Sequence, residues 1–127
     1  MCVRGASALQ RILNENPRAA VKLILVWEPV LATDVTRPLP RVLAQVTDRR
    51  AIQFWDPSRA LSAELVQAAR ANHAGSLAAS AEAIGPIFWD YFAYFPAGVR
   101  WEATPPEPAK WYFPVVEHEP EIRGLIR

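Results

Sequence analysis

One apolar segment, Ala20 to Trp27, constrains the fold more than any other part of the chain. It is short and aliphatic and lies between Pro17 and Pro29. A nearly continuous apolar run of this length is typical of a β-strand that is covered on both faces. The segment before it, Ser7 to Asn14, carries apolar residues at the spacing of one helical face: Ala8, Leu9, Ile12 and Leu13. A helix followed by a buried strand predicts an α/β domain.

The second half of the chain predicts further elements of such a domain. A short strand is possible at 51–55, and a helix is predicted from Asp56, as N-cap, to about Asn72. The aromatic run 88–95 predicts a central strand. Pro96–Gly98 then predicts a turn into a second strand at 99–103, so we expect a β-hairpin.

Length and composition limit the functional class. The 127 residues fit a single domain spanning 1–127, and 51% hydrophobic residues exclude a disordered chain. With a net charge of +1, the chain lacks the excess positive charge that sequence-independent nucleic-acid binding requires. No apolar run reaches the roughly 18 residues of a membrane span, and the start lacks the apolar region of a secretory signal. We therefore expect a cytoplasmic protein with no nucleic-acid or membrane partner.

Two further positions complete a recognisable order of elements. Cys2 immediately precedes the first predicted helix, and Pro86, within Ile84–Ile87, immediately precedes the predicted hairpin. This order resembles the thioredoxin-like superfamily with its first strand missing, over roughly Cys2 to Ala103. The resemblance implies a three-layer α/β/α fold with a mixed sheet that is N-terminally incomplete. The segments Trp27–Glu28–Pro29 and Trp55–Asp56–Pro57 depart from the general pattern and favour a divergent, bacterial branch.

The resemblance also implies a redox chemistry. Cys2 matches the second cysteine of the family's Cys-x-x-Cys motif, and Pro86 matches its cis-proline, which holds the substrate backbone beside the thiol. A cysteine at a helix N-terminus has a lowered pKa, and this favours the reactive thiolate. Its partner would be a thiol-containing protein or a small thiol. A buried acid assists proton transfer in the family, and Glu28 and Asp90 are the candidates here.

The family's first cysteine and first strand would precede Met1, and this leaves three possibilities open. Either the sheet closes differently, or a partner supplies a strand, or the chain begins inside a longer protein. A single cysteine excludes an intramolecular disulfide and a cysteine-rich metal site. The histidines, His73 and His118, lie far apart, so we expect no metal. No nucleotide-binding or nucleophile-elbow motif is present, and we expect no cofactor.

A second candidate site lies where the first strand ends. The loop from Pro29 to Pro40 follows that strand, and α/β folds place ligand sites at the carboxyl ends of strands. Trp27, Glu28 and Asp34 are the candidate substrate-binding residues there. The simpler interpretation is that the acids cap helices or lie in solvent, and that the tryptophans anchor the core. Two functions follow: a thiol–disulfide redox protein, or a non-catalytic binding domain that uses its aromatic and proline-rich loops.

Overall fold

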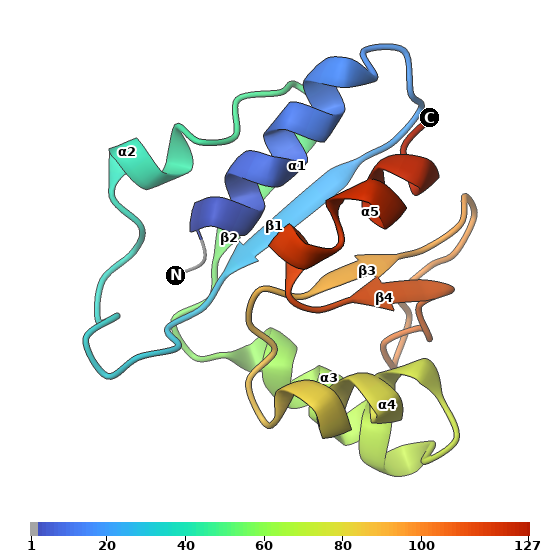
Figure 1. Ribbon diagram of the computed structural model, residues 1–127. Helices are drawn as coiled ribbons and strands as arrows, with labels where there is room; N and C mark the ends of the chain where they lie inside the picture. Colours follow the sequence, from blue (N-terminus) through green and yellow to red (C-terminus); the bar gives the residue numbers. More distant parts are fainter. Residues whose placement is uncertain (1–2) are drawn as a thin grey trace.

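A computed structural model describes residues 3–127, so Cys2 lies outside the described residues. The described chain is a mixture of helices and short strands, which agrees with the α/β class (Figure 1). In chain order the elements are α1 (Val3–Glu15), β1 (Leu23–Trp27), α2 (Pro40–Leu43), β2 (Ala51–Trp55), α3 (Ala60–Ala71), α4 (Ser76–Ile84), β3 (Phe92–Tyr94), β4 (Lys110–Tyr112), η1 (Val115–Glu117) and α5 (Glu119–Leu125).

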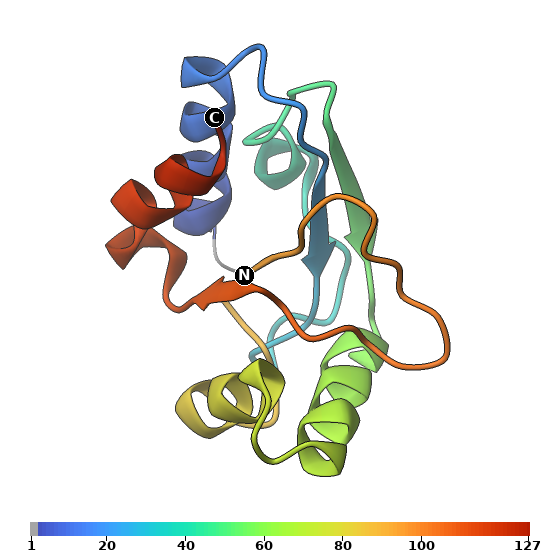
Figure 2. The ribbon, with the colours of Figure 1, turned by 90° about the vertical axis from the view of Figure 1, so that its right-hand side faces the viewer.

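Helix α1 confirms the helix predicted from the apolar spacing and is longer at both ends. Its apolar stripe is fully buried and forms an apolar cluster with Phe92 of β3 and Ile122 of α5. Ala6 on the same helix belongs to a second cluster with Trp27 of β1. Helix α1 therefore covers parts of both sheets, and α5 lies beside it on the same side (Figures 1 and 2).

The strands form two separate two-stranded sheets among the described residues. β1 and β2 are parallel and in register from Leu23 opposite Ala51 to Trp27 opposite Trp55. β3 and β4 are antiparallel, with Phe92 opposite Tyr112. The strands predicted at 20–27 and 51–55 are confirmed in type, and β1 is shorter than predicted.

The predicted burial of the first strand on both faces is wrong within the described chain. Odd-numbered residues of β1 and β2 pack toward α1 and α2, whereas Ile24, Ile52 and Phe54 are 58%, 40% and 53% exposed. The reason lies in the helix that follows β2. Helix α3 does not fold back over the sheet but packs on α4, and together they form a third apolar cluster around Leu65 and Leu77 (Figure 2).

The predicted hairpin between 88–95 and 99–103 is also wrong. Residues 99–103 form no strand, and β3 pairs instead with β4, which begins at Lys110. The intervening segment carries Pro105, Pro106 and Pro108, and proline has no N–H to donate to a strand ladder. β4 begins after the last of these prolines.

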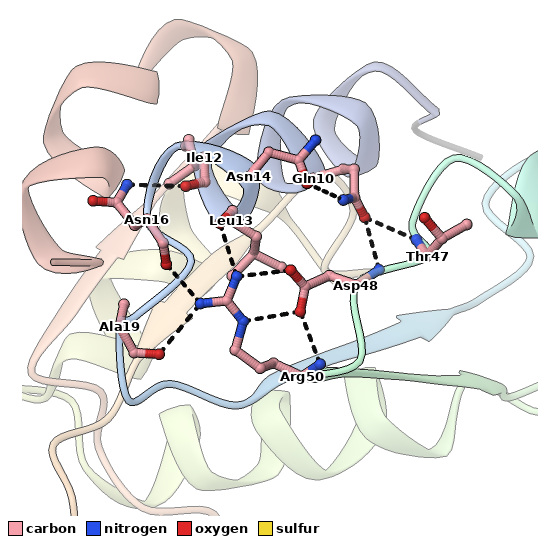
Figure 3. Close-up of polar contacts among 9 residues, drawn as sticks. All are labelled: Gln10, Ile12, Leu13, Asn14, Asn16, Ala19, Thr47, Asp48 and Arg50. Atoms are coloured by element: carbon pink, nitrogen blue, oxygen red, sulfur yellow. Dashed lines mark hydrogen bonds and ion pairs between the residues drawn. The ribbon is translucent and has the colours of Figure 1, made fainter.

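Arg50 ties the carboxyl end of α1 to the start of β2 (Figure 3). Its guanidinium donates to the carbonyls of Leu13 and Asn16 at 2.7 Å each, and to that of Ala19 at 3.2 Å. It also donates to both carboxylate oxygens of Asp48, at 2.7 and 2.8 Å. The last carbonyls of a helix have no partners within it, so Arg50 supplies donors and positive charge where both are favourable.

None of the helices in residues 3–127 combines the length and the apolar character that crossing a membrane requires. The longest, α1, has 13 residues and carries charged side chains on its exposed face.

Candidate functional site

The carboxyl ends of β1 and β2 lie side by side because the two strands are parallel. Trp27 and Trp55 are register partners, and the Asp56 N–H donates to the Trp27 carbonyl at 2.9 Å. The two Trp-acid-Pro segments therefore leave the sheet together. Glu28 and Asp56 carry their carboxyl groups to the same place, directly beside the start of α3.

Glu28 is 7% exposed, and both of its carboxyl oxygens are bonded to Ser62 in the first turn of α3. The Ser62 N–H donates to Oε1 at 3.0 Å, and the Ser62 hydroxyl donates to Oε2 at 2.5 Å. The Phe88 N–H in turn donates to the Ser62 oxygen at 2.9 Å. This chain of bonds links the end of β1, the start of α3 and the segment that follows Pro86.

Asp56, at the end of β2, also accepts hydrogen bonds from residues at the start of α3. Its Oδ2 accepts the Leu61 N–H at 2.8 Å, and its Oδ1 accepts the N–H and the hydroxyl of Ser58. The helix predicted to start at Pro57 begins only at Ala60, because Arg59 has a left-handed backbone with φ 59°. The N-cap is therefore Arg59, and the predicted N-cap at Asp56 is wrong, although the Asp56 carboxylate still accepts the Leu61 N–H in the first turn of α3.

The environments of the two acids shift their pKa values in opposite directions. Burial raises the pKa of Glu28; the Ser62 hydrogen bonds oppose this, and the nearby Asp56 charge adds to it. Burial also acts to raise the pKa of Asp56, but the donors Leu61 and Ser58 outweigh it and the pKa is lowered. A proton is therefore bound more readily by Glu28 than by Asp56.

This acid pair holds the start of α3. Its oxygens accept the first free N–H groups of the helix, where negative charge is stabilised by the helix dipole. Neither acid lines the neighbouring cleft. A general acid or base must reach the proton that it transfers, and Glu28 is enclosed.

A cleft of about 470 Å³ opens at this end of the sheet, between the loop after β1 and the turn after β2. Its lining combines apolar side chains and polar backbone with two charged residues: Pro29, Val30, Leu31, Ala32, Asp34, Val35, Trp55, Pro57 and Arg59. Asp34 shapes the loop, because its Oδ2 accepts the N–H groups of Val30 at 3.1 Å and Leu31 at 3.0 Å. The Leu31 N–H and then the Val30 N–H hold the pKa of Asp34 below its usual value.

Arg59 is the cationic group of this cleft. Its side chain is exposed and forms no ion pair within residues 3–127. Val35 and Leu31, on the opposite wall, are 79% and 63% exposed, which is unusual for such apolar side chains. The cleft thus combines exposed apolar surface with one available positive charge.

The structure separates the predicted binding residues. Asp34 lines the cleft, and Glu28 lies behind it. Trp27 is buried away from it, where its Nε1 donates to Gln53 Oε1 at 2.9 Å, and Gln53 Nε2 donates to the carbonyls of Leu43 and Val46. Trp27 therefore anchors the α2 segment to the sheet, as the simpler interpretation holds.

Sequence reasoning missed Trp55 and Arg59 as cleft residues. The available signal was the second Trp-acid-Pro segment, because parallel pairing of two such strands brings both segments to one edge. Arg59 has no comparable signal, since its place depends on the left-handed turn before α3.

Of the predicted redox residues, the structure describes Pro86 and Asp90. Cys2 lies outside the described residues, and Pro86 is exposed at the end of α4. The expected cis bond at Pro86 is wrong: within the described chain the cis bond is Phe113–Pro114. Gly85, the residue after α4, has a φ of 100°, a backbone conformation that glycine adopts without steric cost. Asp90 packs against Gly5 in the first turns of α1.

No group of three or more metal-ligating side chains occurs in the part of the chain that the structure describes. His118 contacts two neighbouring side chains. Its ring packs against that of Tyr112 at a centroid distance of 5.2 Å, and its Nδ1 lies 3.8 Å from Glu121 Oε1.

Comparison of the chain with protein-family models, with curated proteins and with solved structures gives no significant match.

Proposed function

We propose that this chain is a non-catalytic binding domain of thioredoxin-like type, and that its ligand site is the cleft between the Pro29–Val35 loop and Trp55. The observation that carries the proposal is the cleft itself. It lies at the carboxyl end of a parallel strand pair, and the two acids behind it are engaged in holding α3.

The chemistry of the cleft selects an apolar anion. Val35, Leu31 and Trp55 offer apolar and aromatic surface, and Arg59 offers a guanidinium with no internal partner among the described residues. The Asp34 carboxylate is turned to its own loop, where it accepts two N–H groups. A ligand with an apolar body and one carboxylate or sulfonate group would satisfy both kinds of surface.

The thioredoxin-like part of the proposal is supported by the order of the elements. A helix precedes a parallel strand pair, a helical hairpin follows, and an antiparallel pair and a final helix complete the chain. Helix α1 contacts both sheets, as a helix that covers one larger sheet would. A further strand between the two pairs would be needed to join them into the family's mixed sheet.

A titration with the fluorescent apolar anion 8-anilinonaphthalene-1-sulfonate tests the site. Arg59→Gln should weaken binding at least about fivefold and reduce its dependence on salt, because the charge contact is lost. Arg49→Gln removes an equally exposed arginine outside the cleft and should change binding less than about twofold.

A second pair of variants tests the apolar wall. Val35→Ser should weaken probe binding, whereas Val99→Ser, an exposed valine outside the cleft, should not. Circular dichroism verifies that each variant is folded. If Arg59→Gln and Val35→Ser both bind the probe like the unaltered chain, the cleft is not the ligand site.

A second candidate function is thiol–disulfide exchange by Cys2. The observation that favours it is that α1 begins at Val3, so the cysteine immediately precedes a 13-residue helix in the sequence. In this reaction the thiolate attacks an external disulfide and releases one of its sulfurs as a thiolate. The rate of alkylation by iodoacetamide against pH tests it. A thiol pKa near 8.5, the value of free cysteine, would remove the support.

A further inference from the structure

Strand β2 has one edge that pairs with no other strand of residues 3–127. Figure 2 shows β2 as the outer strand of its sheet, with β1 between it and α1. The Asp56 N–H, directly after β2, donates to the Trp27 carbonyl, so the even-numbered residues at β2 bond to β1. Backbone groups alternate along a strand. The N–H and C=O groups of Gln53 and Trp55 therefore point to the outer edge.

This edge lacks the features that normally keep a strand edge from pairing. Exposed edges are usually protected by charged side chains, prolines or bulges. The residues of β2, 51–55, include neither a charged side chain nor a proline, and their register with β1 has no bulge. An extended peptide can therefore add to β2 as a further strand, with backbone hydrogen bonds supplying part of the affinity.

The edge ends at the ligand cleft. Trp55 is both the last residue of β2 and part of the cleft lining, and Pro57 and Arg59 continue that lining. A strand that adds to β2 in the parallel direction therefore brings its carboxyl terminus to the cleft. An antiparallel strand would bring its amino terminus there, where the positive charge of Arg59 is unfavourable.

The cleft matches the chemistry of a polypeptide's carboxyl end. Its exposed guanidinium, that of Arg59, forms no ion pair within residues 3–127 and can donate two parallel hydrogen bonds to a carboxylate. The acids here are engaged by donors of this chain, because Asp34 accepts two N–H groups of its own loop and Asp56 accepts donors at the start of α3. Leu31 and Val35 offer apolar surface for a side chain. A terminal residue carries an apolar side chain and a free carboxylate together.

We propose that the cleft and the β2 edge together bind the C-terminal end of another polypeptide, which adds to the β1–β2 sheet as a third parallel strand. Its terminal carboxylate contacts Arg59, and the side chain of its last residue enters the cleft between Val35 and Trp55. This inference rests on the proposed ligand cleft and adds the class of ligand to it. A small apolar acid would use the cleft alone, whereas a polypeptide also uses the outward N–H and C=O groups of Gln53 and Trp55.

A library of random octapeptides, attached through their amino ends so that their carboxyl ends are free, tests the proposal. We expect the chain to select peptides that end in an apolar residue. By calorimetry these peptides should bind at least about tenfold more tightly than acetylated leucine, and amidation of the terminal carboxylate should weaken them at least about fivefold. N-methylation along one set of alternate residues should weaken binding and along the other should not, since only every second N–H faces β2.

A double-mutant cycle tests the contact between Arg59 and the terminal carboxylate. Arg59→Gln should weaken binding of the free-carboxylate peptide at least about fivefold. It should change binding of the amidated peptide less than about twofold, because the contact is already lost there. Arg18→Gln removes an exposed arginine outside the cleft and should leave both affinities within about twofold. Independent losses from amidation and Arg59→Gln would overturn the placement of the carboxylate.

Three results of the peptide measurements would overturn the proposal: no selection of an apolar last residue, acetylated leucine that binds as tightly as the peptides, or equal effects of N-methylation at every position. A dimer that selected peptides do not dissociate, measured by sedimentation, would place a second copy on the edge and also overturn it. Titration with 8-anilinonaphthalene-1-sulfonate separates this outcome from failure of the proposed function. Probe binding that depends on Arg59, without peptide binding, retains the cleft as a ligand site and removes only the polypeptide.

Discussion

The Ser62 hydroxyl donates a 2.5 Å hydrogen bond to Glu28 Oε2 and at the same time accepts the Phe88 N–H at 2.9 Å. This one side chain joins three segments that are distant in sequence: the end of β1, the start of α3 and the stretch that leads to β3. Ser62 is itself 2% exposed, so water cannot replace it when it is removed.

Ser62→Ala should therefore destabilise the fold by about 1–3 kcal/mol, because it leaves the Phe88 N–H and a Glu28 oxygen without their partner. Urea unfolding measures the change. Ser58→Ala removes an exposed hydroxyl that also donates to a carboxylate and should cost clearly less. Equal losses for the two variants would show that burial of the Ser62 bond has no special weight.

The raised pKa of Glu28 predicts a pH dependence of stability. The folded protein holds this proton more tightly than the unfolded chain, so the contribution is complete below the ordinary value of 4.5. It is lost as pH rises from there through the raised folded pKa. Unfolding free energies between about pH 4 and pH 8 should show this decline. Glu28→Gln, which cannot ionise, should flatten it; a decline of the same size in the variant would contradict the assignment.

Arg50 offers a test of the tie between α1 and β2. Arg50→Ala should cost about 2–3 kcal/mol, since it removes donors from three carbonyls and from Asp48. Arg49→Ala, its exposed neighbour, should stay within about 0.5 kcal/mol of the unaltered chain. Thermal unfolding of both variants provides the comparison, and similar losses would refute a special role for Arg50.

Two helical glycines should respond in opposite ways to alanine. Alanine normally stabilises a helix by up to about 1 kcal/mol over glycine, and Gly124 in α5 has room for the added carbon. A Cβ on Gly5 in α1 would overlap Asp90 Oδ1 and crowd Val115. Chemical unfolding should therefore show a gain for Gly124→Ala and a loss for Gly5→Ala. Gains of equal size would show that Asp90 moves aside without cost.

Local pattern was enough to predict α1 and the type of β1 and β2, because each depends on side chains a few residues apart. The partner of β3 was not predictable in the same way. The nearer candidate at 99–103 alternates well, but β3 pairs with the residues after Pro108, which only the folded chain brings near.

In the candidate site too, local sequence determines some features and the folded chain determines others. The position of the loop at a strand end follows from the sequence, and Asp34 indeed lines the cleft. Which tryptophan faces it depends on the register and on Gln53, which holds Trp27 on the buried side. The burial of Glu28 depends on where α3 begins, and that is decided by a single left-handed residue, Arg59.

The apolar cluster of α3 and α4 is separate from the two clusters around α1. Its polar ties to the rest of the chain join Glu28 and Asp56 to the start of α3, Glu107 to the start of α4, and Tyr91 to Ser80. We therefore expect this helical hairpin to open as a cooperative unit of its own, at a lower free energy than the clusters around α1. Amide hydrogen exchange would register it as a set of protons from 60–84 that exchange together and sooner than those of α1.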